Sequence, residues 1–122
     1  MKLIARTESF EQMAKRSRDR ARKLARGEKI PAQKVISFES PFDIFEVLTT
    51  ERIRLCVVAR TKPYSVTGLA TALKRDPKSV RRDVLKLEKH GVLRTRFEIN
   101  PGHGRVKIVE PVSQSLELRA KF

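Results

Sequence analysis

The hydrophobic positions of the chain recur mainly at helical spacing as far as Gly91 and alternate with polar positions beyond it. A repeat of about 3.6 residues predicts helices with one buried face, whereas a repeat of two predicts strands. The pattern therefore predicts an α+β fold in which several helices come before a β-hairpin.

The first helical stretch begins at Ser9-Phe10-Glu11-Gln12, which has the form of a capping box, and ends at Gly27. One side of this helix is basic, and the other carries an apolar stripe of Phe10, Met13, Ser17, Ala21 and Leu24. Three interpretations stay open. The stripe packs on its own domain beneath a solvated charged face, or it forms a dimer contact. Direct contact of the basic side with phosphates is the third interpretation and is compatible with either of these. Insertion into a membrane surface is disfavoured because the stripe is thin and rich in Ala and Ser.

The next segments predict a scaffold. Residues 33–38 form a short alternating run after Pro31, which interrupts any continuing helix, and we predict a strand there. Ser40-Pro41 has the cap and first-turn proline of a helix, and Thr50-Glu51 begins another that ends before Pro63. We expect both helices to belong to the core, with side chains that include Phe42, Phe45, Ile53 and Val57.

Two further helices are separated by only a short turn. Ser65 caps the first, and Asp76-Pro77 supplies a cap and a first-turn proline for the second, which covers residues 77–90. The second helix is cationic on one side and apolar on the other. Its apolar stripe consists of Val80, Val84 and Leu87. This layout is typical of a helix-turn-helix, whose second helix enters the major groove of DNA.

Alternating segments follow the helices. Residues 93–99 and 105–109 flank a turn at residues 100–104 and predict a β-hairpin, and residues 116–122 predict a further strand at a sheet edge or against a partner. Helices followed by a hairpin make a winged helix-turn-helix, here with an added amphipathic basic helix and short strands near both ends of the chain. We therefore expect three parts: an N-terminal helix and strand (1–40), a winged helix-turn-helix domain (41–111) and a C-terminal strand (112–122).

The net charge of the chain indicates what kind of partner it binds. The 122 residues include 28 basic and 14 acidic side chains, which gives a formal net charge of +14, and the excess gathers in residues 1–30 and 61–91. Such an excess on a small domain implies an anionic partner, such as nucleic acid or an acidic protein. Cys56 is the only cysteine, and no run of about 20 apolar residues could span a bilayer. We expect a cytoplasmic protein with no membrane partner.

The sequence offers no catalytic or metal-binding constellation. His90 and His103 are the only histidines, and neither has the spacing to Cys56 that a zinc site requires. No nucleophile stands beside a base, and no carboxylate pair lies in an apolar setting. We predict a protein that is not an enzyme and has no catalytic residues, no metal and no cofactor.

The middle of the chain resembles the winged helix-turn-helix regulators grouped as MarR-like, in particular small DNA-binding proteins of bacteria and archaea. Residues 35–110 carry the resemblance, through Val47-Leu48-Thr49, Arg52, Leu69-Ala70, Arg75-Asp76, Val80, Asp83-Val84, Leu87 and Gly91. The resemblance implies sequence-specific binding of double-stranded DNA by a homodimer, typical of an autoregulating repressor. Some proteins of this group resemble antitoxins, which implies an alternative: neutralisation of a small toxin through the N- or C-terminal segment.

Candidate site residues follow from these patterns. For the recognition helix they are Lys78, Ser79, Arg81, Arg82 and Lys86. For the wing and the DNA backbone they are Lys62, Lys89, Arg94, Arg96, His103, Arg105 and Lys107. For dimerisation they are the five residues of the apolar stripe. Non-specific binding of RNA or DNA, which would use the same charge without reading bases, is disfavoured, because one Tyr, no Trp and mostly core-patterned Phe leave no stacking platform.

Overall fold

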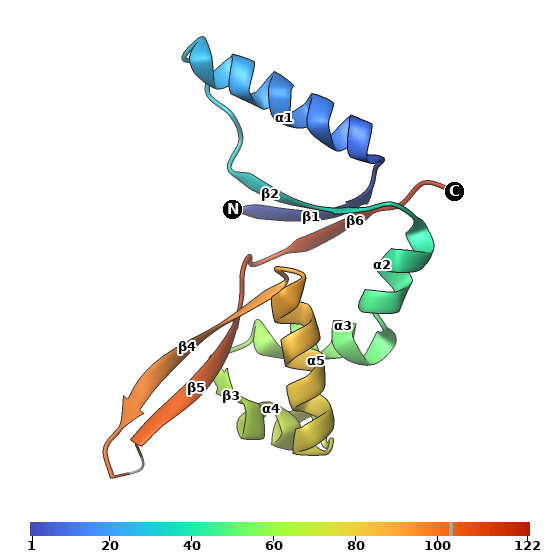
Figure 1. The fold of residues 1–122 in the computed structure, drawn as a ribbon. Helices are drawn as coiled ribbons and strands as arrows, with labels where there is room; N and C mark the ends of the chain where they lie inside the picture. The colour runs from blue at the N-terminus through green and yellow to red at the C-terminus, as the bar shows by residue number, and fades with distance from the viewer. Residues whose placement is uncertain (103) are drawn as a thin grey trace. The chain divides into compact units, whose positions relative to one another are not determined.

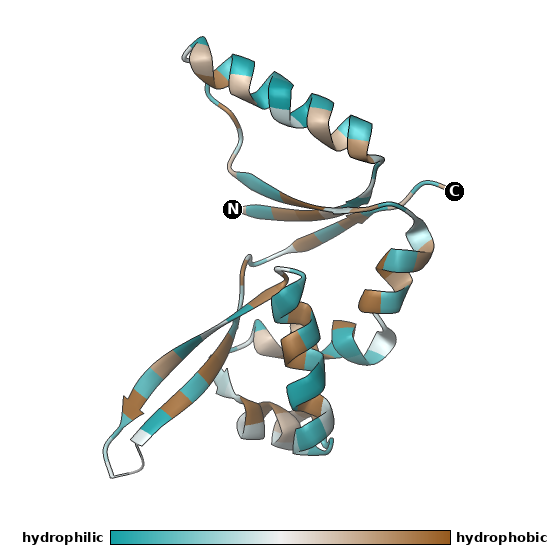
Figure 2. Ribbon diagram, viewed as in Figure 1, coloured by the Kyte–Doolittle hydropathy of each residue, from teal (hydrophilic) through white to brown (hydrophobic). Residues whose placement is uncertain are grey.

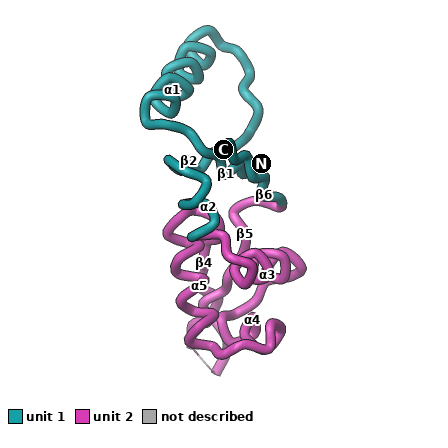
Figure 3. The backbone as a smooth tube through the Cα atoms, turned by 90° about the vertical axis from the view of Figure 1, so that its right-hand side faces the viewer, with its two compact units in different colours: residues 1–46, 115–122 teal, residues 47–114 magenta. Residues whose placement is uncertain are grey.

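The computed structural model describes residues 1–102 and 104–122 and divides the chain into two compact units (Figure 3). Unit 1 comprises residues 1–46 and 115–122, and unit 2 comprises residues 47–114. None of the helices in these ranges is both long and apolar enough to cross a membrane.

Unit 1 contains a three-stranded parallel sheet in the order β2-β1-β6 (Figure 1). The elements are β1 (Lys2–Thr7), α1 (Phe10–Ala25), β2 (Gln33–Phe38), α2 (Pro41–Val47) and β6 (Leu116–Arg119). The predicted strands β2 and β6 are confirmed, but β1 was not predicted. It is the central strand, with Leu3, Ile4 and Ala5 all buried. A central parallel strand is covered on both faces, so it shows no alternation of apolar and polar residues.

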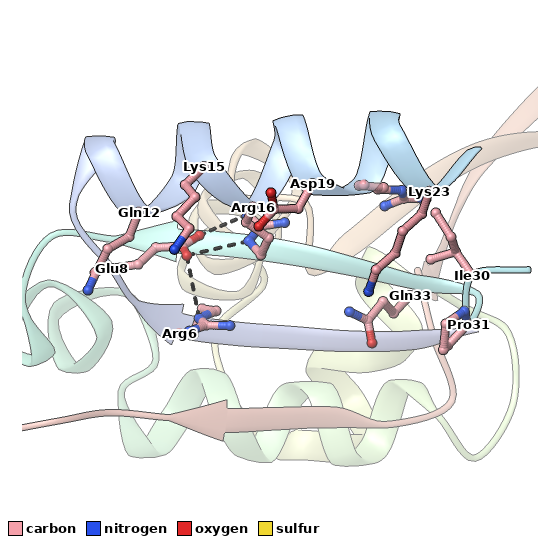
Figure 4. A pocket seen from close by; sticks show the side chains of 11 residues that line it. Arg6, Glu8, Gln12, Lys15, Arg16, Asp19, Lys23, Ile30, Pro31 and Gln33 are labelled. Carbon is pink, nitrogen blue, oxygen red and sulfur yellow. Dashed lines mark hydrogen bonds and ion pairs between the residues drawn. The ribbon is translucent and has the colours of Figure 1, made fainter. Parts of the chain in front are cut away.

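Helix α1 begins as the sequence predicts. The Ser9 hydroxyl accepts a hydrogen bond from the Gln12 amide, 3.1 Å away, and the Gln12 side chain accepts one from the Ser9 amide at 2.9 Å. Most of its apolar stripe, however, does not pack on unit 1, and Met13 is the half-buried member. Phe10 is 72% exposed and Leu24 is 58% exposed, and no residue of α1 is buried. The charged side of the helix faces the strands instead (Figure 4).

A buried carboxylate ties α1 to the sheet. Glu8 is only 6% exposed, and Arg16 Nη2 of α1 donates to its Oε1 at 2.8 Å. The Ser37 hydroxyl of β2 donates to the same oxygen, and Arg6 Nε of β1 lies 3.6 Å from Oε2. The hydrogen bond from Arg16 is the main cause that lowers the pKa of Glu8 below its ordinary value, with Ser37 and the positive charges of both arginines adding to it against the cost of burial.

Unit 1 should therefore lose stability in acid. Because the folded state lowers the pKa of Glu8, the ionised carboxylate stabilises unit 1 above its unfolded pKa, and this contribution disappears as the pH falls through the folded pKa. We expect Glu8→Gln to lower the free energy of unfolding near neutral pH and to have a smaller effect near about pH 3. Urea titrations of both proteins at the two pH values measure this. A deficit of the same size at both would contradict the role of the charge.

Unit 2 is a winged helix-turn-helix, as predicted. It contains α3 (Thr50–Ala59), β3 (Tyr64–Ser65), α4 (Val66–Leu73), α5 (Pro77–Lys89), β4 (Leu93–Asn100) and β5 (Gly104–Pro111). The strands form an antiparallel sheet in the order β3-β5-β4. The side chains of Leu55, Leu69, Val80, Val84, Leu87, Leu93 and Val109 are fully buried and form the core. Burial raises the pKa of the Cys56 thiol to about 11, so this cysteine stays a neutral, apolar core residue.

Helices α2 and α3 are less buried than predicted. In α2, Ile44 is buried, but Phe42 is 80% exposed and the ring of Phe45 stacks on that of Phe122, with 6.5 Å between centroids. In α3, the buried face consists of Leu55, Cys56 and Ala59, whereas Ile53 and Val57 are exposed. A helix packs only one side on its neighbours, and in short apolar helices periodicity alone does not show which side.

Candidate nucleic-acid interface

The turn between α4 and α5 is short and fully capped. Helix α4 ends at Lys74, whose backbone is left-handed with a φ of 54°, and α5 begins three residues later at Pro77. Asp76 is the N-cap of α5, and its Oδ2 accepts a hydrogen bond from the amide of Ser79 at 3.1 Å. The predicted cap-and-proline start of α5 is confirmed.

A buried ion-pair network holds α5 in place, which the sequence analysis missed. Asp83 lies on the inner side of α5, where it is 9% exposed. Arg52 Nε of α3 donates to its Oδ1 at 3.0 Å, and Arg75 Nη2 of the turn donates to its Oδ2 at 2.7 Å. Arg52 also donates through Nη1 to the carbonyl oxygen of Val47, 3.1 Å away. The network therefore joins α3, the turn and α5 through one carboxylate.

The outer side of α5 is cationic and carries no ion pairs in the described part of the chain. Lys78, Arg81 and Arg82 are exposed, and Ser79 and Lys86 are half-buried. No hydrogen bond or ion pair within residues 1–102 and 104–122 engages the charged groups of this set. All five residues predicted for recognition thus lie along one helix with their basic groups available to a partner.

The hairpin of β4 and β5 forms the wing. Its register runs from Leu93 opposite Pro111 to Asn100 opposite Gly104. Apolar and polar residues alternate along β4, whereas β5 has two adjacent apolar residues, Ile108 and Val109 (Figure 2). Leu93 is buried, but Ile99 is 83% exposed. The face of β4 that carries Leu93 and Ile99 is therefore buried at the start of the strand and exposed near the turn. Alternation alone would predict that this face is buried along its whole length.

The predicted wing cations differ in their surroundings. Arg105 places its guanidinium 4.7 Å from the centroid of the Phe97 ring, and Lys62 places its amine 5.0 Å from that of Tyr64. Both contacts are cation–π interactions that leave the charge at the surface. Lys89 is exposed and Lys107 half-buried, whereas His103 lies outside the described residues.

Arg94 and Arg96 are held by carboxylates of the hairpin itself. Arg94 Nε donates to Glu110 Oε1 at 2.8 Å, and Arg96 Nε donates to Glu110 Oε2 at 3.2 Å. Arg96 also pairs with Glu98 at 2.6 Å. The hydrogen bonds from Arg94 and then Arg96 lower the pKa of Glu110. These two arginines are therefore partly neutralised, unlike the cations of α5.

The sequence matches the HVO_A0114 protein family over residues 47–110, more than half of the chain. None of the curated proteins matches it. Among solved structures, it is similar to a possible transcriptional regulator from Methanosarcina mazei Go1, at 23% identity and a TM-score of 0.51, over 62% of this chain and 68% of that one.

Two mycobacterial structures are also similar. One is the homodimeric winged helix-turn-helix DNA-binding domain of a possible ArsR-family regulator from Mycobacterium bovis, at 15% identity and a TM-score of 0.50, over 58% of this chain and 62% of that one. The other is Rv0081 of Mycobacterium tuberculosis, at 19% identity and a TM-score of 0.50, over 59% of this chain and 69% of that one. At these identities the likeness establishes the winged helix-turn-helix fold.

Proposed function

The chain belongs to the HVO_A0114 family, and from this premise we propose that it is a transcriptional regulator that binds double-stranded DNA and is not an enzyme. The observation that carries the proposal is the outer side of α5, where exposed basic groups stand on a helix-turn-helix without partners in the described chain. A major groove admits one helix, and a cationic helix face matches its phosphate rims. The similar structures from Methanosarcina and Mycobacterium bovis, named as possible regulators, support this function.

Within this proposal the start of α5 reads the bases. Lys78, Ser79, Arg81 and Arg82 occupy its first turns, and in a helix-turn-helix the first residues of the second helix contact base edges. Lys86 lies further along and is assigned to a phosphate, together with Lys62 and Lys89. A MarR-like regulator that represses its own operon is the specific form that we propose.

Salt dependence tests DNA binding itself. The affinity for a duplex, measured by fluorescence anisotropy, should fall linearly on a double logarithmic plot against salt concentration, because each bound phosphate releases counterions. Lys86→Ala should reduce that slope by about one. An affinity that does not depend on salt would overturn the proposal.

The wing supplies a second contact with the duplex. Arg105 projects at the surface over Phe97, next to Gly104, where the chain has a φ of 72°. We expect Arg105→Glu to weaken duplex binding by about tenfold at low salt, because it replaces an attraction to phosphate by a repulsion. Lys34→Glu, at an exposed position of β2, reverses the same charge in unit 1 and is the control. If both variants bind equally well, the wing does not touch DNA.

We further propose that the protein acts as a homodimer that contacts DNA at two half-sites. The apolar stripe of α1, from Phe10 to Leu24, is exposed except at the half-buried Met13, and its small residues Ser17 and Ala21 allow two helices to approach closely. The M. bovis domain of similar fold is described as homodimeric, which supports this assembly. A two-fold dimer doubles the contacts across a palindromic site.

The double variant Phe10→Glu/Leu24→Glu should therefore be monomeric and bind DNA weakly while it keeps its helix content, because an interface cannot bury unpaired carboxylates. Light scattering and circular dichroism measure this. Phe42→Glu/Phe122→Glu, which changes exposed apolar residues outside the stripe, should stay dimeric. A stripe variant that remains a dimer would move the interface elsewhere.

A second function is favoured by the exposed aromatic residues of unit 1. Phe42 is 80% exposed, Phe45 53% and Phe122 99%, and such residues are enriched where proteins bind proteins. We propose as the alternative an antitoxin that covers a small acidic toxin with its N- or C-terminal segment. Co-expression with the product of the adjacent gene, followed by size-exclusion chromatography, tests it. Separate elution of the two proteins would exclude that product as the partner.

A further inference from the structure

Unit 1 contains a hollow of about 460 Å³ between α1 and the strands β1 and β2, separate from the helix-turn-helix (Figure 4). A volume of this size is in the range of small-molecule sites. The side chains of Lys15, Asp19 and Lys23 extend from the helix toward the strands, while Ile30 and Pro31 close one end. The hollow exists because α1 turns its charged side, not its apolar stripe, toward the sheet.

The lining is cationic even after its own ion pairs are taken into account. Its two carboxylates are Glu8 and Asp19. Glu8 is occupied by Arg16, Ser37 and Arg6, and Asp19 lies 3.7 Å from Arg22. The lining cations that take part in no ion pair within residues 1–102 and 104–122 are Lys15, Arg20 and Lys23. Three positive groups around one partly enclosed space repel one another, and a multivalent anion would relieve that repulsion.

The spacing of these cations suits an extended anion. Lys15 and Lys23 are eight residues apart on α1, which is about 12 Å along the helix axis. A chain of phosphates can pair with both lysines while each side chain stays beside its own turn of the helix, whereas a single phosphate would have to draw both side chains to one point. Ile30 and Pro31 add an apolar surface at the end near Lys23, which suits a flat ring.

We propose that this hollow binds a small molecule that carries two or more phosphate groups, of the nucleoside diphosphate or triphosphate class. Lys15, Arg20 and Lys23 contact the phosphates, and Ile30 and Pro31 contact the ring. Arg16 keeps Glu8 neutralised, so that its carboxylate does not repel the ligand. The site lies within unit 1, and the proposal does not depend on DNA binding by unit 2.

Isothermal titration calorimetry with ATP, on the full chain at physiological salt, tests the site. We expect ATP to bind and Lys15→Ala/Lys23→Ala to weaken it by at least about tenfold, since each loses a charge-assisted hydrogen bond. The control is Arg18→Ala/Lys29→Ala, which removes the same charge from residues of unit 1 that do not line the hollow. It should change the affinity by less than about twofold.

Equal losses in both double variants would overturn the proposal, because they would show attraction by net charge alone. Equal affinity for citrate and for ATP would overturn the phosphate assignment. Duplex affinity separates this proposal from the proposed function: the Lys15→Ala/Lys23→Ala protein should keep it. If that variant loses DNA binding and the unmodified protein does not bind ATP, the hollow belongs to a DNA surface. If ATP binds and no duplex does, the site stands and the proposed function fails.

Discussion

Asp83→Ala is expected to lower the free energy of unfolding of unit 2 by about 3–5 kcal/mol, which is the range found when one partner of a buried ion pair is removed. Asp83 is buried, and its two oxygens accept hydrogen bonds from Arg52 and Arg75 at 3.0 and 2.7 Å. Removal of the carboxylate takes away the ion pair that both guanidinium groups share, although their side chains are only 21% and 20% exposed, and leaves Arg75 the longer contact with Glu51 at 3.9 Å. Small domains have a total stability of about 5–15 kcal/mol, so the loss should be large.

Urea unfolding followed by circular dichroism measures this change. Glu98→Ala is the control, because Glu98 pairs with Arg96 at 2.6 Å in an exposed bridge outside the network, and such pairs contribute about 0–1 kcal/mol. Asp83→Asn keeps the shape and one acceptor oxygen, so it should be intermediate. A cost for Asp83→Ala no larger than that for Glu98→Ala would show that the network does not hold α5 on α3.

The second large effect is expected on specificity. Arg81→Ala and Arg82→Ala should each reduce the affinity for the preferred DNA sequence by about tenfold or more, because a side chain that contacts a base edge gives about 1–3 kcal/mol of discrimination. Both residues are exposed on α5, where no carboxylate of the described chain competes for them. Binding to unrelated duplex should change much less.

The measurement is the ratio of the affinity for the preferred sequence to the affinity for unrelated duplex, at one salt concentration. Arg18→Ala, on α1 and outside the helix-turn-helix, should leave the ratio unchanged. If Arg81→Ala and Arg82→Ala lower both affinities by the same factor, the two arginines contact phosphates and the bases are read elsewhere.

Local chemistry made the helix-turn-helix predictable from sequence. The caps Ser65 and Asp76 and the proline Pro77 act within a few residues, and the structure shows each where it was predicted. The stripe of α5 could be predicted for the same reason, because helical periodicity alone determines which of its residues share a side. The hairpin could likewise be predicted from two alternating segments around a glycine-containing turn, but alternation does not give its register, which places Phe97 opposite Lys107 and Ile99 opposite Arg105.

Contacts between distant segments were harder to predict. Strand β1 contains only three buried apolar residues and is recognisable as a strand through its parallel partners β2 and β6, which come later in the chain. The sequence does indicate that Asp83 has an ion-pair partner, since a carboxylate beside the apolar stripe of α5 requires one when it is buried. Its partners Arg52 and Arg75, however, come from other elements, and spacing does not identify them.

The apolar stripe of α1 shows a further limit of what hydrophobic periodicity can predict. Periodicity correctly predicts that Phe10 and Leu24 share one side of the helix, but not what covers that side. The charged side of α1 faces the strands, where Arg16 donates two hydrogen bonds to the buried Glu8 at 2.8 and 3.4 Å. Helical periodicity does not show that this side, and not the stripe, packs on the sheet.

Selection of bound sequences from a pool of random duplexes tests the central claim most directly. A dimeric sequence reader should enrich a short motif in two inverted copies, with centres about 10–10.5 base pairs apart or a multiple of that distance. The same duplexes should bind the unmodified protein more tightly than the Arg81→Ala and Arg82→Ala proteins. Recovery of a pool with no sequence enriched over the input would contradict the claim that α5 reads DNA.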